Sequence, residues 1–466
     1  MKVIMFIAIM ISTFHHLHGQ DIAGQWNGLL KVQGLELPLV FHISPNDTGY
    51  TATMDSPDQG AIGLPVNSTT FENNILQIQL NAIGIQYRGQ WQENNTFSGE
   101  FTQGGMTVPL DLSRDKISKT KVNRPQEPIP PYPYYTEEVR FKNNEADIVL
   151  AGTLSLPEKN GIFPAVVLIS GSGPQNRDEE LMGHKPFLVL ADDLTRKGIA
   201  VLRFDDRGTA ESTGQFNTAT TKDLATDVKA AVQYLSTRSE INDYIGLIGH
   251  SEGGIIAPIV ASDMDNIDFI VLLAGTGIRG DRLLLLQQEL INKANGMTEE
   301  EWQEIQPINA TAIDMVLNSS NLDSLSSALM AYFEDSVQKK EGGDLPGGMG
   351  NKGYLEAQVQ QLSTKWMQYF IQFDPATALE KVRCPVLALI GEKDLQVPAE
   401  VNLNAIKTAL KQGGNHNVTT ITLPNLNHLF QECNTGSPNE YATIEQTFSP
   451  IALDTISHWI KDQINQ

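Results

Sequence analysis

From about residue 137 onward, short and continuous apolar runs alternate with stretches of helical periodicity, and this alternation restricts the chain to few folds. Four of the runs are Ala165–Ser170, Ile199–Asp205, Tyr244–Gly249 and Phe269–Ala274. A strand is apolar along its whole length when both faces of its sheet are covered, as in parallel sheets. The pattern therefore predicts a doubly wound, mostly parallel α/β sheet.

The alternation is interrupted between about residues 276 and 373. Apolar residues recur there at helical spacing, for example in Tyr354–Phe373, and the glycine-rich stretch Gly342–Gly353 predicts a mobile loop. The strand pattern resumes with Pro385–Ile390 and Val418–Leu423. A helical insertion between two strands predicts a lid over an active site.

Residues about 21–113 have a different pattern, in which short alternating segments are separated by polar turns. The expected strands are Leu37–Ile43, Tyr50–Met54, Ile75–Leu80, Ile85–Trp91 and Thr96–Phe101. Their spacing of about ten residues predicts a small antiparallel β-barrel or sandwich. Five prolines within residues about 114–136 predict an extended linker between this domain and the α/β domain, residues about 137–466.

The first 20 residues have the organisation of a secretory signal. Lys2 is followed by the apolar run Val3–Ile11 and then by a polar stretch that ends near Gly19. The run is too short to cross a bilayer as a helix, and no cysteine follows it for lipid attachment. We expect an exported protein, periplasmic or secreted, without a stable membrane anchor.

The composition limits the classes of partner that the chain is expected to bind. The 33 Lys+Arg and 55 Asp+Glu residues give a net charge of 33 − 55 = −22, which argues against nucleic acid as a partner but is compatible with a small neutral substrate. Two cysteines, Cys384 and Cys433, are too few for a cysteine-rich metal site. We expect no disulfide between them, because the predicted sheet places them near opposite ends of a strand. No cofactor and no metal ion are expected.

The segment Tyr244–Gly254 contains the pattern Gly-x-Ser-x-Gly directly after an apolar strand and before a helical stretch. This context is typical of a nucleophile elbow, in which the serine occupies a strained turn and only small neighbours clear the backbone. Gly249 and Gly253 would provide that clearance. The N-terminus of the following helix would stabilise developing negative charge. The pattern predicts Ser251 as a nucleophile.

A serine on such an elbow is followed in the chain by its acid and then by its histidine. Of the histidines after Ser251, His416 precedes the last strand and His458 lies in the C-terminal helical stretch. His428 follows the last strand after a short loop, at the edge of the sheet where Ser251 is expected. We predict His428 as the general base.

The acid should follow the penultimate strand, which leads into Gly391–Pro398. Asp394 is the preferred residue and Glu392 is the alternative. An oxyanion hole needs two oriented backbone N–H groups. We predict the N–H of Glu252, which follows the nucleophile, and the N–H of Ser172 in a glycine-rich loop, with Gly173 as the alternative to Ser172.

Together these motifs resemble the α/β-hydrolase superfamily of serine hydrolases. The residues that carry the resemblance are Gly249–Gly253, Asp205–Ser212, Gly391–Pro398 and Asn427–His428. Ser170–Glu179 resembles a group of exported bacterial esterases that carry an N-terminal β-rich domain and are similar to the serine aminopeptidase and prolyl oligopeptidase branches. The resemblance implies hydrolysis of carboxylic esters with short acyl chains, and Ala210 departs from the glycine usual at its position.

Two other functions stay open at this point. An aminopeptidase of the same fold would need an acidic anchor for a free amine, and Glu252 and Glu299–Glu301 are available for it. The latter run is more simply the start of a helix with Thr298 as its N-cap. The second alternative is a non-catalytic protein that binds carbohydrate or cell wall through its β-rich domain.

Overall fold

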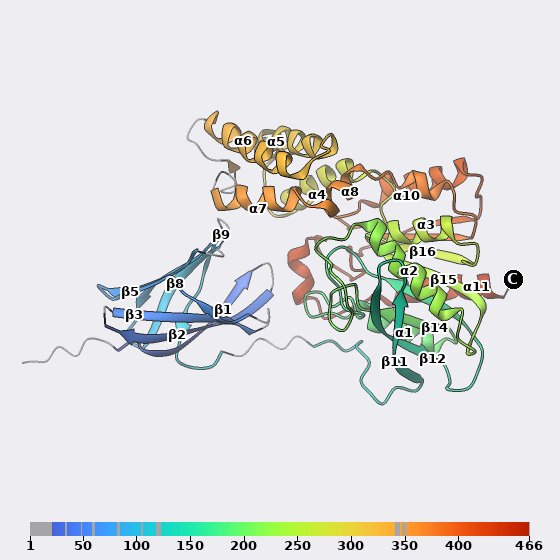
Figure 1. Ribbon diagram of the computed structural model, residues 1–466, viewed down its shortest axis with the longest axis horizontal. Coiled ribbons are helices and arrows are strands. Elements are labelled where there is room, and N and C mark those ends of the chain that lie inside the picture. Colours follow the sequence, from blue (N-terminus) through green and yellow to red (C-terminus); the bar gives the residue numbers. More distant parts are fainter. Residues whose placement is uncertain are drawn as a thin grey trace, which may run out of the picture. The chain divides into compact units, whose positions relative to one another are not determined.

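The structure is a computed structural model of the chain (Figure 1). It describes residues 21–32, 35–47, 49–57, 61–81, 84–103, 106–117, 123–340, 345–346, 350 and 352–465. They form two compact units, the first made almost entirely of residues up to 117 and the second of residues from 123 onward. The predicted export signal and most of the predicted loop Gly342–Gly353 lie outside the described residues, so both stay predictions.

The first unit is a ten-stranded antiparallel sheet that closes on itself. Its strands are β1 (Gly24–Val32), β2 (Leu35–Asn46), β3 (Gly49–Ser56), β4 (Ala61–Pro65), β5 (Ser68–Glu72), β6 (Ile75–Leu80), β7 (Ile85–Trp91), β8 (Thr96–Gln103), β9 (Met106–Pro109) and β10 (Leu112–Ser113). Eight of them form a ring in the order β1-β2-β3-β5-β6-β7-β8-β10, because β10 pairs with both β8 and β1. The unit is thus a barrel, and closure protects the ring strands from edge pairing.

The interior of the barrel is a packed apolar core. Trp26, Phe41 and Phe97 are fully buried, and the rings of Trp26 and Phe97 meet edge to face with their centroids 4.7 Å apart. The Trp26 indole N–H donates to the carbonyl of Ile22 at 2.8 Å. The guanidinium of Arg114 lies 4.2 Å from the centre of the Trp26 ring. These contacts identify Trp26 as a central residue of the barrel.

The second unit is built on the mostly parallel sheet that the sequence predicts. Its eight strands are β11 (Tyr135–Asn143), β12 (Ile148–Leu156), β13 (Phe163–Ile169), β14 (Ala200–Phe204), β15 (Ile241–His250), β16 (Phe269–Leu273), β17 (Val386–Gly391) and β18 (Val418–Leu423). They lie in the order β11-β12-β14-β13-β15-β16-β17-β18. β12 runs antiparallel to both of its neighbours, and all pairs from β14 to β18 are parallel.

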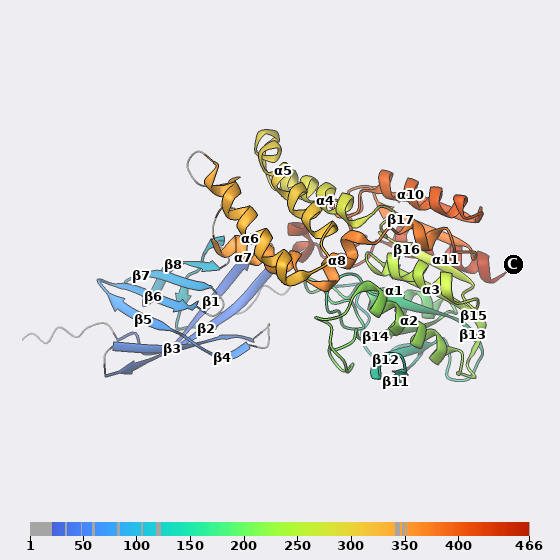
Figure 2. The ribbon, with the colours of Figure 1, turned by 45° about the horizontal axis from the view of Figure 1, so that its top comes forward.

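Helices cover both faces of this sheet (Figure 2). They are α1 (Pro186–Arg196), α2 (Thr221–Leu235), α3 (Gly253–Asp263), α10 (Ala399–Gln412) and α11 (Pro450–Ile464), with a 3₁₀ turn at Pro438–Thr443. Alternate residues of β13 serve the two layers: Val167 packs with the α2, α3 and α10 side, and Val166 packs with the α1 and α11 side. Because every residue of the central strands faces a covering helix, these strands are continuously apolar.

A helical lid lies between β16 and β17, as expected. It contains α4 (Gly280–Ala294), α5 (Glu299–Leu317), α6 (Leu322–Gln338), α7 (Lys352–Leu362), α8 (Lys365–Gln372) and the short α9 (Ala376–Leu379) (Figure 1). The predicted helical region Tyr354–Phe373 forms two helices, because the Thr364 hydroxyl caps a new one by accepting from the N–H of Met367 at 3.1 Å. The expected cap at Thr298 is confirmed, since Thr298 and Glu301 form a reciprocal capping box.

Two smaller expectations concern cysteines and membranes. Cys384 and Cys433 are both free thiols. Within the described ranges, no helix combines the length and apolar character needed to cross a bilayer.

Candidate active site

Ser251 occupies a strained turn between β15 and α3. Its φ is +52°, in the left-handed region that disfavours residues with a side chain. A Cβ on Gly249 would lie 2.0 Å from the carbonyl oxygen of Gly253, and a Cβ on Gly253 would lie 2.2 Å from the carbonyl oxygen of Ile169. Only glycine fits at these two positions, as the elbow pattern predicts. The turn holds Ser251 at the carboxyl end of a central strand.

His428 and Asp394 meet at the same rim of the sheet. His428 Nδ1 lies 2.8 Å from Asp394 Oδ2, and both side chains are buried. The other carboxylate oxygen, Oδ1, accepts from the backbone N–H groups of Gln396 and Val397 at 2.8 Å each. Because the carboxylate oxygen is an acceptor, His428 Nδ1 carries its proton and Nε2 is left with a lone pair.

The residues considered as alternatives lie elsewhere. His416 and His458 are exposed. Glu392 is also exposed, and its Oε2 accepts from the N–H of Asn425 at 2.9 Å. None of these three side chains is among the residues that line the cavity at the rim.

A cavity of about 230 Å³ opens at this rim and connects the sheet with the lid. Ser251, His428, Ser172 and Glu252 all line it. The lid contributes Leu283, Leu284, Gln287, Gln361, Trp366, Met367 and Phe370. The rings of Trp366 and Phe370 stack with centroids 5.2 Å apart and form part of an apolar wall. Four of the predicted site residues, Ser251, His428, Ser172 and Glu252, thus line one cavity, and Asp394 reaches it through His428.

The loop after β13, which contains Ser172, is held by buried carboxylates. Asp206 accepts from the Ser170 hydroxyl and from the Gln175 N–H, each at 2.9 Å. Burial raises the pKa of Asp206 to about 8. Glu179 Oε1 accepts from the N–H of Gly171 at 2.6 Å. Ser172 lies between these attachment points, so its backbone is held on both sides.

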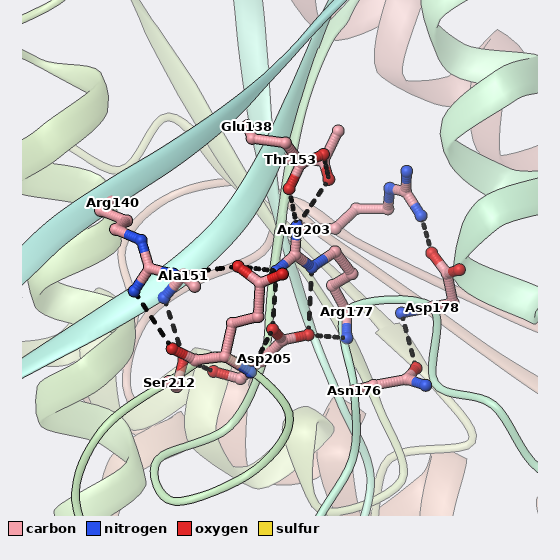
Figure 3. Close-up of polar contacts among 11 residues, drawn as sticks. Glu138, Arg140, Ala151, Thr153, Asn176, Arg177, Asp178, Arg203, Asp205 and Ser212 are labelled. Carbon is pink, nitrogen blue, oxygen red and sulfur yellow. Dashed lines mark hydrogen bonds and ion pairs between the residues drawn. The ribbon is translucent and has the colours of Figure 1, made fainter.

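A second set of ionic contacts fixes the far end of this loop (Figure 3). The guanidinium of Arg177 donates to both carboxylate oxygens of Asp205, at 3.1 and 2.7 Å, and also contacts Glu138. Arg203 forms an ion pair with Asp178. Burial opposes ionisation of Asp205, but its hydrogen bonds from Arg177 outweigh burial and lower its pKa. The loop is therefore tied to β11 and to the end of β14.

Arg207 has a structural role in the loop after β14. Its Nε donates to Asp227 at 2.7 Å and its Nη2 donates to the carbonyl of Asp223 at 2.6 Å, so it joins the loop after β14 to helix α2. Ala210 in the same loop has a φ of +45°. The sequence departure at Ala210 thus leaves an alanine in a conformation that favours glycine.

The Glu252 side chain joins the elbow to the lid. Its Oε1 accepts from the Thr221 hydroxyl at 2.7 Å and from the Trp366 indole N–H at 2.8 Å. Its Oε2 is buried. Burial raises the pKa of this carboxyl, and hydrogen bonding to Thr221, Trp366 and Ser172 opposes part of that rise. Glu252 thus contacts α2, the lid and the loop after β13.

Sequence reasoning missed a second acid–histidine pair at the rim. His250 Nδ1 lies 2.9 Å from Glu179 Oε1, and both residues line the cavity. His250 directly precedes Ser251, and Glu179 ends the segment Ser170–Glu179 that carries the family resemblance, so both positions were visible in the motifs. Their pairing was not, because it depends on the path of the loop after β13. Across the described ranges, no group of three or more potential ligands is arranged to hold a metal ion.

Comparison with known proteins identifies the family. Residues 146–428 match the X-Pro dipeptidyl-peptidase (S15) family. The esterase EstD of Thermotoga maritima is 23% identical over 367 residues, which cover 78% of each chain. Among solved structures, the Pyrococcus furiosus esterase Pf2001 has a TM-score of 0.44 and 16% identity, over 75% of this chain and 98% of that chain. Est1E of Butyrivibrio proteoclasticus, solved with ferulic acid, has a TM-score of 0.40 and 18% identity, over 70% of this chain and all of the other (100%).

The family match, together with the order of the strands, confirms the expected α/β-hydrolase fold and removes the non-catalytic alternative. The matched residues include the elbow, the lid and the loop that carries His428. The chain is an enzyme that belongs to the X-Pro dipeptidyl-peptidase (S15) family of α/β-hydrolases.

Proposed function

We propose that the protein is a serine hydrolase that cleaves carboxylic esters with short acyl groups, using Ser251, His428 and Asp394. The observation that carries this proposal is the 2.8 Å contact between His428 and Asp394 beside a cavity that Ser251 and His428 both line. A serine, an imidazole and an orienting carboxylate at one rim are the groups that acyl transfer through a covalent intermediate requires.

In the proposed mechanism, the Ser251 hydroxyl oxygen attacks the acyl carbon while His428 Nε2 takes its proton. The negative oxygen of the tetrahedral intermediate accepts from the backbone N–H groups of Ser172 and Glu252. His428 then donates the proton to the departing alcohol, which leaves an acyl group on Ser251. Water, activated by the same imidazole, releases the acid and restores the serine. Asp394 keeps the imidazole in the required tautomer throughout.

The size of the cavity supports small substrates. Its volume of about 230 Å³ lies below the roughly 300–1,000 Å³ typical of sites for drug-sized ligands. Leu283, Met367 and Phe370 give it an apolar wall that suits a short acyl chain. We expect turnover of p-nitrophenyl esters to be highest for acetate or propionate and to fall steadily through octanoate. A maximum at octanoate would contradict the short-chain preference.

One observation favours a second candidate, an aminopeptidase related to the S15 activity. Glu252 lines the cavity, and its carboxyl could accept from a substrate ammonium group. Glu299–Glu301, in contrast, lie in the first turn of α5 and do not line the cavity. Glu252 is therefore the acid to test.

Two substrates separate these candidates. An esterase turns over p-nitrophenyl acetate far faster than Gly-Pro-p-nitroanilide, and Glu252→Gln leaves ester turnover largely intact because the amide oxygen can still accept from Thr221 and Trp366. An aminopeptidase prefers the anilide and loses it selectively in Glu252→Gln, since the carboxylate is gone. Preference for the anilide in the wild type would overturn the esterase proposal.

A further inference from the structure

The pair of His250 and Glu179 lies directly beside the proposed nucleophile. His250 ends β15, one residue before Ser251, and its Nε2 lies 3.0 Å from the backbone carbonyl oxygen of His428. The two imidazole rings are 4.9 Å apart between centroids. His250 and Glu179 are only 7% and 4% exposed. The pair therefore contacts the elbow, the loop that carries His428 and the loop after β13.

Gly171 lies next to Ser251 and next to the pair of His250 and Glu179. A Cβ built on Gly171 would lie 3.2 Å from Ser251 Cβ, 3.3 Å from Glu179 Oε1 and 3.4 Å from His250 Nδ1. These atoms thus surround one point next to the predicted oxyanion hole. A movement of the pair would shift Gly171 and with it the N–H of the adjacent Ser172.

Hydrogen-bond partners determine how many protons His250 carries. A backbone carbonyl oxygen can only accept, so His250 Nε2 must carry a proton to bind the carbonyl of His428. Glu179 Oε1 already accepts from the N–H of Gly171 at 2.6 Å. Because the same oxygen faces His250 Nδ1 at 2.9 Å as an acceptor, Nδ1 is the atom that donates. Both ring nitrogens then donate, and the ring is an imidazolium.

We propose that His250 is held as an imidazolium and acts as a positioning residue for the hydrolytic site. Its two N–H groups fix the backbone of His428 and the carboxylate of Glu179, and Glu179 in turn orients the N–H of Gly171. Loss of one proton from His250 breaks one of these two bonds. The site therefore depends on the protonation of a histidine that takes no part in proton transfer to substrate.

The surroundings support the charged form. Burial acts to lower the pKa of His250, but the Glu179 carboxylate outweighs burial, and the net pKa is raised. The carbonyl of His428 and the Asp394 carboxylate act in the same direction. The groups that face His250 are thus Glu179 from the loop after β13, Asp394 from the loop after β17, and His428 and the Phe430 ring from the loop after β18.

Glu179→Gln tests the proposal with little change of shape. Both hydrogen bonds of Glu179 use Oε1, and an amide oxygen can accept both, so the substitution chiefly removes the negative charge. His250 should then lose its proton at lower pH than in the wild type. We expect the alkaline fall in kcat for p-nitrophenyl acetate to move down by about one pH unit or more. The ratio of variant kcat to wild-type kcat should be higher at pH 6 than at pH 8.

The matched control is Glu180→Gln, which removes the same charge from the next residue. Glu180 is 45% exposed and lies 3.8 Å from Lys185. Its pH profile should equal that of the wild type. A purely structural role of Glu179 would instead lower kcat by the same factor at every pH. That result, or an unchanged alkaline limb in Glu179→Gln, would overturn the proposal.

A spectroscopic readout does not depend on activity. In protein labelled with ¹⁵N-histidine, with His250→Gln used for assignment, His250 should show two protonated ring nitrogens at pH 7. A neutral His250 ring at pH 7 in the wild type would overturn the proposal even if Glu179→Gln failed to fold. The inference rests on the proposed function only for its catalytic role: full activity of Ser251→Ala would refute Ser251 as nucleophile and leave this NMR prediction standing.

Discussion

The barrel and the rim of the α/β sheet differ in which residues adopt a positive φ. In the described part of the barrel, the non-glycine residues with positive φ are Asn73, Asn74 and Asn95, all at turns between strands, and asparagine tolerates this conformation. In the α/β unit they include Glu179, Met182, Ala210, Ser251, Ala274 and Phe430, each of which follows the carboxyl end of a strand. In the barrel, positive φ thus occurs at residues that tolerate it. At the rim, where the candidate site lies, it occurs at residues that disfavour it.

The two regions also bury different groups. The barrel core is dominated by Trp26, Phe41, Tyr87 and Phe97. The rim buries Glu179, Asp205, Asp206, His250, Glu252, Asp394 and His428. Burial of charged groups destabilises the folded state, and their partners offset this loss only in part. The rim should therefore contribute less to stability than the barrel core. Substitutions at the rim should change rates, and substitutions in the barrel should change stability.

The largest effect is expected for Ser251→Ala. It should lower kcat for p-nitrophenyl acetate by about 10⁴–10⁶-fold, as loss of a triad member typically does. The midpoint of thermal unfolding should hardly change, because alanine keeps the Cβ and removes one hydroxyl. His428→Ala should reduce kcat nearly as much, whereas His416→Ala and His458→Ala serve as exposed controls. A crippling effect of His416→Ala would show that the base is assigned wrongly.

Trp26→Ala tests the barrel side of the comparison. It removes a fully buried indole and should lower the free energy of unfolding of the barrel by about 3–5 kcal/mol. The kcat of folded protein should stay the same. Urea titration followed by fluorescence measures the loss, and Ile62→Ala, at a side chain that is 67% exposed, is the control. If Trp26→Ala lowered kcat without lowering the free energy of unfolding, the contrast between the barrel and the rim would be wrong.

Acid should weaken the α/β unit through His184. This residue is fully buried against the carbonyl of Tyr441, and burial lowers its pKa to about 4. Between pH 6.5, the ordinary value, and about pH 4, the unfolded chain binds a proton that the folded chain does not. The free energy of unfolding should therefore fall by about 3 kcal/mol as the pH drops through this window, and this contribution is fully present above it.

His184→Gln should remove that slope from urea titrations of the α/β transition, and His416→Gln, at an exposed position, should leave it unchanged. The window between pH 6.5 and 5 is the clearest, because carboxylates contribute below it. An identical dependence of the unfolding free energy on pH in the wild type and in His184→Gln would contradict the lowered pKa of His184.

The smallest effect is expected for Ala210→Gly. Glycine relieves the left-handed conformation, worth about 1–2 kcal/mol, but it also gives the unfolded chain more freedom, worth about 0.5–1 kcal/mol. The net expectation is a gain of about 0.5 kcal/mol in the free energy of unfolding. Gly208→Ala, at a φ of +70° in the same loop, should have the opposite sign. A destabilising Ala210→Gly would mean that the strain at this position is not significant.

The sequence predicted those features that leave a local pattern. The parallel strands are continuously apolar because both faces are covered, and the elbow has a fixed glycine spacing. Barrel closure leaves no such pattern, because it depends on pairing of Asn27 with Ser113 across most of the domain. The strands β1, β4, β5, β9 and β10 are not among the five expected strands, and helix α6 was not predicted among the lid helices.

In the candidate site too, some residues could be selected from local patterns and others could not. Chain order and strand ends were sufficient to select Asp394 and His428, which the structure brings within 2.8 Å. The contact of Glu179 with His250 depends on a loop whose residue 179 has a φ of +50°, a conformation that glutamate rarely adopts. The partners of Glu252 come from α2 and the lid, so they too required the folded chain.

Covalent labelling tests the assignment of Ser251 most directly. A fluorophosphonate should modify the wild-type protein once, and mass spectrometry of its peptides should locate the adduct on Ser251. Labelling of His428→Ala should be drastically slower, because no base activates the hydroxyl. An active protein that carries no adduct, or carries it on a different residue, would contradict the proposed site.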